Sequence, residues 1–217
     1  FDGFPGFLEF DPANDRILGI VSRLTDNRRF LARFDPVTGD MTLIGTGFTT
    51  GGYSSGISAF DAAHQIFYLV ANVFGGSDAA LYRVNAATGA VIGSATLNTA
   101  IPELGLTPNF LAYDPVSAQV LAIVNLPPNK VLASINPTTG TLTALSAPMA
   151  ATSYSSGVAD FDEATGIFYF AANDALGTTS TLFRVEADGT VLPSHAFTSS
   201  DPDITPGPTF LVVPEPA

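Results

Sequence analysis

The chain alternates between short apolar runs and clusters of turn-forming residues along its whole length. Near the N-terminus the apolar runs cover 7–10, 17–21, 30–34 and 41–44, and they are rich in β-branched and aromatic side chains. Asp, Asn, Pro and Gly fill the positions between them, which is typical of antiparallel strands joined by tight turns. No stretch has the 3.6-residue apolar period of an amphipathic helix. The pattern therefore predicts an all-β protein.

This strand-and-turn pattern repeats four times. Each unit contains an aromatic–Asp pair, and successive aspartates are 50, 53 and 48 residues apart: Asp11, Asp61, Asp114 and Asp162. A second turn follows each pair and begins at Asp35, Asn85, Asn136 and Glu186. A period of this length indicates an array or a propeller rather than one irregular domain. The predicted units are 6–50, 53–99, 106–150 and 153–200.

The later units have apolar runs at equivalent positions. We predict strands at 57–60, 66–72, 81–84 and 90–97, at 110–113, 120–125, 131–135 and 141–145, and at 158–161, 167–173, 181–185 and 190–192. Several second strands, such as IFYLVAN, are almost continuously apolar, which predicts burial on both faces. Four-stranded antiparallel units of this size are typical of β-propeller blades, so we predict a β-propeller-like fold of four such units. A solenoid of stacked sheets is the competing architecture.

The alignment of the units also predicts a core. We expect equivalent buried positions for two sets of residues, one on the first strands and one on the third. These sets are Phe10, Phe60, Tyr113 and Phe161, and Phe34, Val84, Ile135 and Val185.

A second periodicity indicates that a two-unit element was duplicated. Units 1 and 3 share PGFLEFDP and PNFLAYDP, and units 2 and 4 share GGYSSGISAFD and TSYSSGVADFD. The opening of units 1 and 3 then recurs as a surplus C-terminal strand: Thr209, Phe210, Leu211, Val212 and Val213. An apolar edge strand needs cover. It either closes the repeat within one subunit or inserts into a neighbour, and we expect the intersubunit version. Residues 1–213 are predicted to form a single repeat domain and 214–217 a short tail.

The composition narrows the classes of partner. Only 13% of residues are charged and the mean hydropathy is +0.31, so the surface is either rich in hydroxyl groups or meant to assemble. The net charge is −12 with one lysine, Lys130, which makes nucleic acid a poor partner. Cysteine is absent, and no apolar run is long enough to span a bilayer. We expect no membrane partner in the mature form.

No catalytic or metal-binding motif stands out. His64 and His195 lie at non-equivalent repeat positions, and no nucleophile elbow, phosphate-binding loop or EF-hand spacing occurs. The four recurring aspartates are expected to be structural, because geometry rather than chemistry repeats them. The segment 199–203 fits a linker turn better than a calcium site. We therefore predict no catalytic residues, no metal and no cofactor.

Two similar connections between units are the candidate ligand sites. Connections lie on the surface of repeat proteins and often carry function, and a Tyr flanked by Ser and Gly suits sugar recognition as well as docking of one unit on the next. The candidate residues are Tyr53, Ser54, Ser55, Tyr154, Ser155 and Ser156.

Two resemblances bear on location. The turns of the type FDPVTGDM resemble those of bacterial extracellular propeller-like repeat domains over nearly the whole chain. The ending Val213-Pro214-Glu215-Pro216 resembles the sorting signature of exosortase-processed (PEP-CTERM) proteins, without the membrane helix and basic tail that follow it there. This resemblance implies an extracellular or cell-surface protein of a matrix or biofilm. Phe1 in place of methionine fits N-terminal processing.

Three functions remain open from the sequence. We expect a non-enzymatic structural or adhesive protein that self-associates into a filament or matrix. A monomeric carbohydrate-binding propeller is the alternative, and a polysaccharide hydrolase or lyase on the same scaffold is the third. The fold by itself does not separate them.

Overall fold

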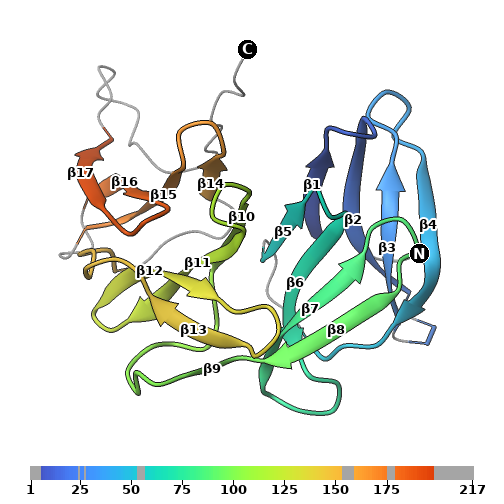
Figure 1. Cartoon of the computed structure of the whole chain (residues 1–217), viewed down its shortest axis with the longest axis horizontal. Helices are drawn as coiled ribbons and strands as arrows, with labels where there is room; N and C mark the ends of the chain where they lie inside the picture. Colours follow the sequence, from blue (N-terminus) through green and yellow to red (C-terminus); the bar gives the residue numbers. More distant parts are fainter. Residues whose placement is uncertain are drawn as a thin grey trace. The chain divides into compact units, whose positions relative to one another are not determined.

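A computed structural model describes residues 6–23, 25–26, 28–52, 57–152, 159–174 and 179–197. All the strands of this part of the chain belong to four antiparallel sheets, each built from consecutive strands (Figure 1). Within it, no helix is long and apolar enough to cross a membrane. The predicted all-β fold of four-stranded units is confirmed, and we call the sheets blades 1 to 4.

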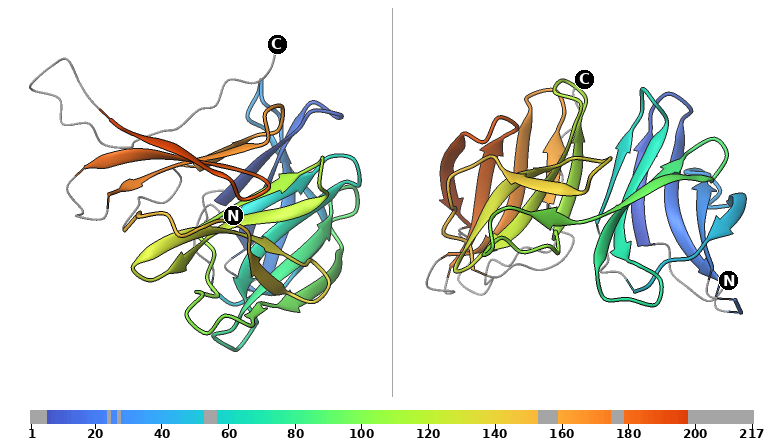
Figure 2. Two further views of the ribbon diagram at one scale, coloured as in Figure 1. Left: turned by 60° about the vertical axis from the view of Figure 1, so that its left-hand side comes forward. Right: turned by 60° about the horizontal axis from the view of Figure 1, so that its bottom comes forward.

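Blades 1 and 2 follow the predicted strand pattern closely. Blade 1 contains β1 (Gly6–Asp11), β2 (Arg16–Arg23), β3 (Arg28–Phe34) and β4 (Met41–Phe48). Blade 2 contains β5 (Ser58–Asp61), β6 (Ile66–Asn72), β7 (Ala79–Asn85) and β8 (Val91–Thr96). In both blades every strand pairs with the next one along the chain, and each sheet is twisted (Figure 2).

Blade 3 has a fifth strand that the sequence did not predict. It contains β10 (Phe110–Asp114), β11 (Gln119–Leu126), β12 (Asn129–Ile135) and β13 (Thr141–Ala144), with β9 (Asn98–Thr99) at its outer edge. Blade 4 contains β14 (Ala159–Asp162), β15 (Ile167–Asn173), β16 (Ser180–Glu186) and β17 (Val191–Ala196). The predicted surplus strand at 209–213 lies outside the described residues.

The recurring aspartates close the turn between the first two strands of their blades. For example, Asp114 accepts the Val116 N–H at 3.0 Å and Asp162 accepts the Ala164 N–H at 3.0 Å. The fifth residue of each turn has a left-handed backbone, which glycine adopts most easily. These residues are Asp15 (φ 44°), Gln65 (φ 54°), Ala118 (φ 55°) and Gly166 (φ 69°). The expected structural role of these aspartates is therefore visible in the geometry of the turns.

The second turn joins the third and fourth strands and is equally regular. In blades 1 to 3 it begins at Asp35, Asn85 and Asn136, whose Oδ1 atoms each accept two backbone N–H groups at 2.8–3.0 Å. A glycine with positive φ ends each of these turns. In blade 4 the turn is one residue shorter, and Asp188 accepts the Thr190 N–H at 2.8 Å instead.

Strand pairing divides the side chains of each blade between two faces. Because directly paired residues point to the same side, Phe10, Ile17, Phe34 and Met41 share one face of blade 1. We call this the leading face, and the equivalent rows define it in the other blades. The opposite, trailing face of blade 1 carries residues such as Leu18 and Leu31.

Two compact units can be distinguished by their internal contacts: Phe1–Asn98 with Ile135–Leu142, and Thr99–Ser134 with Thr143–Ala217. In the first unit the trailing face of blade 1 meets the leading face of blade 2. Glu9 accepts a hydrogen bond from the Ser58 hydroxyl at 2.5 Å, and the rings of Phe48 and Tyr82 stack with centroids 6.4 Å apart.

In the second unit the trailing face of blade 3 meets the leading face of blade 4. Leu121, Ile123 and Leu132 form one apolar core with residues of blade 4 that include Phe168 and Phe170. The same pair of faces therefore packs together in both units.

The predicted core is confirmed except in blade 1 and, in part, in blade 4. Phe60 and Tyr113 are 7% and 8% exposed, and Val84, Ile135 and Val185 are at most 2% exposed. Phe161 is only partly buried. Phe10, however, is 44% exposed and Phe34 is only partly buried, so equivalent burial was wrong for them. They belong to the leading face of blade 1, whose buried cluster consists of Val21, Phe30 and Ala32, with Phe34 packed against it and Phe10 outside it.

Candidate functional site

The predicted ligand residues lie outside the described part of the chain. Tyr53, Ser54 and Ser55, and likewise Tyr154, Ser155 and Ser156, fall in segments that the structure does not describe, so their role stays a prediction. The residues just before them are anchored to the end of a second strand. The Gly51 N–H donates to the Asn72 carbonyl at 2.8 Å, and the Thr152 N–H donates to the Asn173 carbonyl at 3.0 Å.

The intersubunit or closure strand predicted at Thr209, Phe210, Leu211, Val212 and Val213 also lies outside the described residues and stays a prediction.

The histidines belong to separate surroundings. His64 lies in the first turn of blade 2, where its Nδ1 is 2.8 Å from Asp61 Oδ2. His195 lies on β17, where its Nε2 is 3.0 Å from the Arg184 guanidinium. Among the described residues, no group of three or more His, Asp or Glu side chains is placed to hold a metal ion.

Lys130 is buried rather than presented to solvent. It is 8% exposed and its ammonium group donates to the side chain of Asn125. Burial lowers the pKa of this lysine below its ordinary value. The single lysine therefore acts as part of the blade 3 structure.

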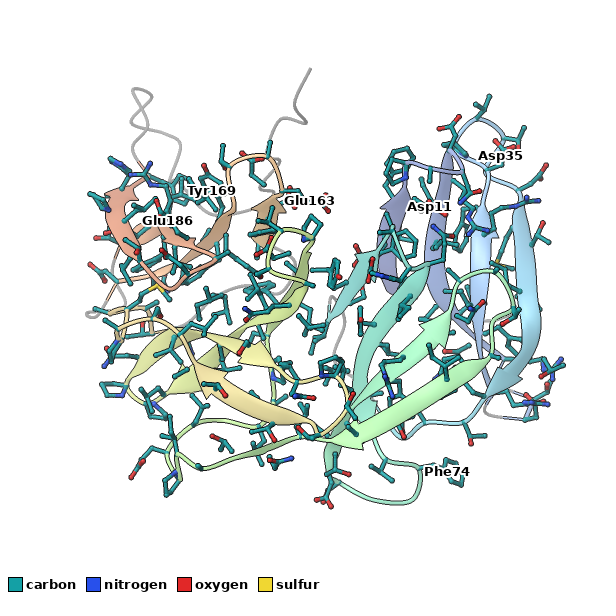
Figure 3. All side chains as sticks on the ribbon, in the orientation of Figure 1. Asp11, Asp35, Phe74, Glu163, Tyr169 and Glu186 are labelled. Carbon is teal, nitrogen blue, oxygen red and sulfur yellow. The ribbon has the colours of Figure 1, made fainter. Side chains whose placement is uncertain are left out.

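A buried carboxylate lies where blades 1 and 2 meet. Asp11 lies on β1 (Figure 3) and is fully buried, and its Oδ2 accepts hydrogen bonds from Arg16 and Asn14, each at 2.8 Å. Gln65 of blade 2 donates to Asp11 Oδ1 at 3.3 Å and accepts from Arg16 at 2.9 Å. Burial alone would raise the pKa of Asp11, but these hydrogen bonds and the charge of Arg16 outweigh it, so the pKa lies below its ordinary value.

The second turn of a blade presses its glycine against the fourth strand of the blade before it. A Cβ placed on Gly89 would lie 2.0 Å from the Ile44 carbonyl oxygen of β4. In the same unit, a Cβ on Gly140 would lie 2.1 Å from the Thr96 carbonyl oxygen of β8. In the second unit, a Cβ on Gly189 would lie 2.2 Å from the Leu145 carbonyl oxygen, next to β13. Only glycine permits so close an approach of two backbones.

The equivalent glycine of blade 1 meets no other blade in the described part of the chain. Gly39 has φ +75°, and no atom of the described residues lies within 4 Å of a Cβ placed there. The residues of this turn, from Asp35 (labelled in Figure 3) to Asp40, are all exposed. Val37 at its tip is 91% exposed. Blade 1 therefore carries the docking turn that blades 2 to 4 use, without a partner among the described residues.

The leading face of blade 1 exposes apolar side chains on both edge strands, with Met41 directly after this turn and Leu8 and Phe10 on β1. Leu8 is 54%, Phe10 44% and Met41 37% exposed. In blade 2 the residue equivalent to Phe10 is Phe60, which the trailing face of blade 1 helps to bury. We call Leu8, Phe10, Met41 and the Asp35–Asp40 turn the blade 1 docking surface.

The trailing face of blade 4 is also less covered than its equivalents. Leu31, Leu81 and Leu132 are each 0% exposed, whereas the equivalent Leu182 is only partly buried. Tyr169 of this face (Figure 3) is likewise partly buried, whereas the equivalent Leu18 and Leu121 are 0% exposed. Blades 1 and 4 thus each expose side chains at positions that the inner blades bury, although Val21, Phe30 and Ala32 of the blade 1 leading face are themselves buried.

Sequence reasoning missed this pair of surfaces. It treated the four units as equivalent, whereas the burial of a unit depends on which neighbours pack on it. The glycine that ends each second turn could have indicated these surfaces in the sequence, because its recurrence implies a close backbone contact at that position.

The fold is similar to that of known β-propellers. No protein-family model and no curated protein matches the sequence. TolB from Acinetobacter baumannii is 14% identical with a TM-score of 0.57, over 90% of this chain and 44% of TolB. The Dos1 propeller is 13% identical with a TM-score of 0.53, over 91% of this chain and 48% of the other. A GH43 glycoside hydrolase is 15% identical with a TM-score of 0.54, over 89% of this chain and 39% of the hydrolase.

These likenesses define the architecture and no more. At 15% identity or less they show the fold alone, and this fold is shared by binding proteins and by hydrolases. The chain spans less than half the length of each of these three structures. The chain is therefore β-propeller-like, and its activity has to be argued from its own surfaces.

Proposed function

We propose that this chain is a non-enzymatic extracellular structural or adhesive protein that self-associates. The observation that carries the proposal is the blade 1 docking surface, where Leu8, Phe10 and Met41 are 54%, 44% and 37% exposed and the docking turn has no partner among the described residues. Exposed apolar side chains on one face of a sheet are typical of a protein–protein interface.

The charge content supports the same conclusion. With 13% charged residues and a positive mean hydropathy, the surface offers little of the charge that normally keeps a soluble monomer apart from its copies. The net charge of −12 still opposes association at low ionic strength. Assembly is therefore expected to strengthen as added salt screens this repulsion.

The extracellular location rests on the sequence resemblances. The propeller-like turns and the Val213–Pro216 ending resemble secreted, exosortase-sorted bacterial proteins. A chain without cysteine is compatible with an oxidising environment. Fractionation of the native host, with detection of the protein in the matrix or on the cell surface, tests this location directly. Recovery of the protein from the cytoplasm alone contradicts it.

The test of self-association is the mass of the particle in solution. Size-exclusion chromatography with light scattering, over a wide range of protein and salt concentration, should give multiples of the 22.5 kDa chain mass. Electron microscopy of the largest species should show rings or filaments. A particle of one chain mass under every condition would overturn the proposal.

Carbohydrate binding is the second candidate, and one exposed aromatic favours it. Phe74, in the loop after β6, is 63% exposed and projects from the blade (Figure 3). Exposed rings of this kind suit stacking on sugars, and one of the similar propellers is a GH43 glycoside hydrolase. A glycan array with the wild type and Phe74→Ala separates the candidates. Binding by a monomer that depends on Phe74 favours this second function, and release of reducing ends from matrix polysaccharide favours a hydrolase.

A further inference from the structure

We propose that the blade 1 docking surface binds the trailing face of blade 4 in a second copy of this chain. This inference rests on the proposed self-association and names the contact through which it occurs. The contact joins two different surfaces, so successive copies are arranged head to tail, as a closed ring or an open filament.

The first argument is that the chain already makes this contact internally. In both compact units a leading face packs on the trailing face of the preceding blade, with the glycine of the second turn against a backbone carbonyl. The three internal contacts of Gly89, Gly140 and Gly189 place a Cβ within 2.0–2.2 Å of that carbonyl. Blade 1 supplies one half of such a contact and blade 4 supplies the other half.

The second argument is that the two halves are apolar and incompletely buried. Leu8, Phe10 and Met41 are exposed on blade 1, while Tyr169 and Leu182 are partly buried on blade 4. Fully buried equivalents of Leu182 occur in each of the other three blades. Covering these faces removes apolar surface from water, which favours association.

Strand register locates the partner backbone on blade 4. Ile44 pairs with Leu31, and the Leu145 N–H donates to the Leu132 carbonyl. His195 pairs with Leu182, the leucine of blade 4 that is equivalent to Leu31 and Leu132. In blade 2 the approached residue, Thr96, instead pairs with Ala80, one position before the equivalent Leu81. By the register of blades 1 and 3, the carbonyl of His195 occupies the place of the Ile44 and Leu145 carbonyls. We assign it as the group that Gly39 of a second copy approaches.

The same equivalence places two carboxylates near each other. Gln65 of blade 2 binds Asp11 of blade 1, and the corresponding residues in the new contact are Asp15 and Asp162. Two like charges weaken the contact at low ionic strength. The experiments below therefore use roughly 0.5 M salt, at which the Debye length falls to a few ångströms.

A matched pair of glycine substitutions tests the contact. Gly39 and Gly75 have φ of +75° and +77°, and a Cβ at either meets no described atom within 4 Å. Gly39→Ala and Gly75→Ala therefore impose the same backbone strain on a folded chain. We expect Gly39→Ala to raise the dissociation constant of the assembly by about tenfold or more, and Gly75→Ala to leave it unchanged. Equal association of both variants with the wild type would overturn the proposal.

Pairs of introduced cysteines test whether blade 4 of a second copy binds the blade 1 docking surface. A Cβ on Gly45 would lie 2.3 Å from the Thr88 carbonyl oxygen, and the residues equivalent to Thr88 and Gly45 in the new contact are Thr38 and Ala196. The chain has no cysteine of its own. A mixture of Thr38→Cys and Ala196→Cys proteins should therefore form a disulfide-linked dimer under mild oxidation. The control mixture, Thr38→Cys with Thr96→Cys, should not, because Gly140 occupies the backbone at Thr96.

The outcomes separate this inference from the proposed function. If the wild type assembles, but Gly39→Ala does not weaken its association and the cysteine mixture forms no disulfide, the copies meet through another surface, such as 209–213. This result overturns only the inference. A chain that carries both Thr38→Cys and Ala196→Cys provides a further check. If it forms a disulfide within itself while the mixture of single variants does not, the blade 1 docking surface binds blade 4 of the same chain, and the inference is overturned. A wild type that never assembles overturns both.

Discussion

At the scale of single residues, side-chain oxygens fix the turns of this protein. Asp114 and Asp162 accept N–H groups from their own turns, and Asp35 does the same in the second turn of blade 1. Backbone N–H groups of Thr38 and Val37 hold the pKa of Asp35 below its ordinary value. The sequence was sufficient to predict this role, because Asp and Asn stabilise turns by a local mechanism that recurs with the repeat.

Asp11 should make the fold sensitive to acid. Its pKa is depressed in the folded chain, so its contribution is complete above the unfolded pKa of about 4 and is lost as the pH falls through the lower folded value. Asp11→Asn should cost about 1.5–3 kcal/mol of unfolding free energy at pH 7 and less at pH 3. Urea unfolding at both pH values measures this. Asp15→Asn, an exposed change in the same turn, is the control. An equal loss at both pH values would contradict the assignment.

The exposure of Phe10 predicts an asymmetry between equivalent aromatics. Phe60→Ala removes a side chain that is 7% exposed and should cost about 3–5 kcal/mol. Phe10→Ala removes one that is 44% exposed and should cost about 1–2 kcal/mol when the protein is kept dilute. Chemical denaturation of the two variants measures both losses of unfolding free energy. Equal losses would mean that the leading face of blade 1 is covered in the folded chain.

At the scale of elements, the blade is the unit that the sequence predicted best. Period-two strands and Asp–Gly turns are local signals, so the four strands of each blade were found within a few residues of their bounds. β9 was missed, since Asn98–Thr99 carries no strand pattern and is held by the Thr139–Thr141 turn, 41 and 43 residues away. The lower burial of equivalent residues in blades 1 and 4 was also not predicted, because burial depends on which neighbours pack on a blade.

Blade docking predicts different costs for two equivalent glycines. Gly39→Ala and Gly89→Ala both place alanine at positive φ, which costs about 1 kcal/mol. Gly89→Ala adds a Cβ that would lie 2.0 Å from the Ile44 carbonyl oxygen and must push blades 1 and 2 apart. We expect a total cost of about 3 kcal/mol or more for Gly89→Ala. Thermal and urea unfolding of dilute protein compare them, and equal costs would contradict the docking geometry.

At the scale of the whole molecule, two blade faces differ from the others: the leading face of blade 1 and the trailing face of blade 4. The inner faces are buried against the adjacent blade, whereas the leading face of blade 1 buries Val21, Phe30 and Ala32 but exposes side chains on its edge strands, and the trailing face of blade 4 is only partly buried. Repeat proteins generally need capped ends for solubility, and here the ends keep apolar side chains such as Leu8 and Phe10 exposed. Composition predicted a tendency to assemble, and these exposed side chains are where we propose that it occurs.

The predicted strand at 209–213 makes a separate prediction about assembly. Deletion of residues 207–217 should leave a folded subunit, because the four strands of every blade in the described part of the chain end before residue 198. If the strand joins subunits, the truncated protein should sediment as one chain. Sedimentation velocity of the truncated and full-length proteins is the measurement. Continued assembly of the truncated protein would leave the blade 1 docking surface as the contact between copies.

The central claim is that the leading face of blade 1 and the trailing face of blade 4 become buried against another copy of the chain. Hydrogen exchange followed by mass spectrometry, on the unmodified protein at low and high concentration, measures this burial at the level of segments. The account predicts that exchange slows with concentration in 35–44 and 190–197, while the turn at 85–89 exchanges at one rate throughout. Exchange in 35–44 and 190–197 that is independent of concentration, in a protein that remains one chain in mass, would contradict it.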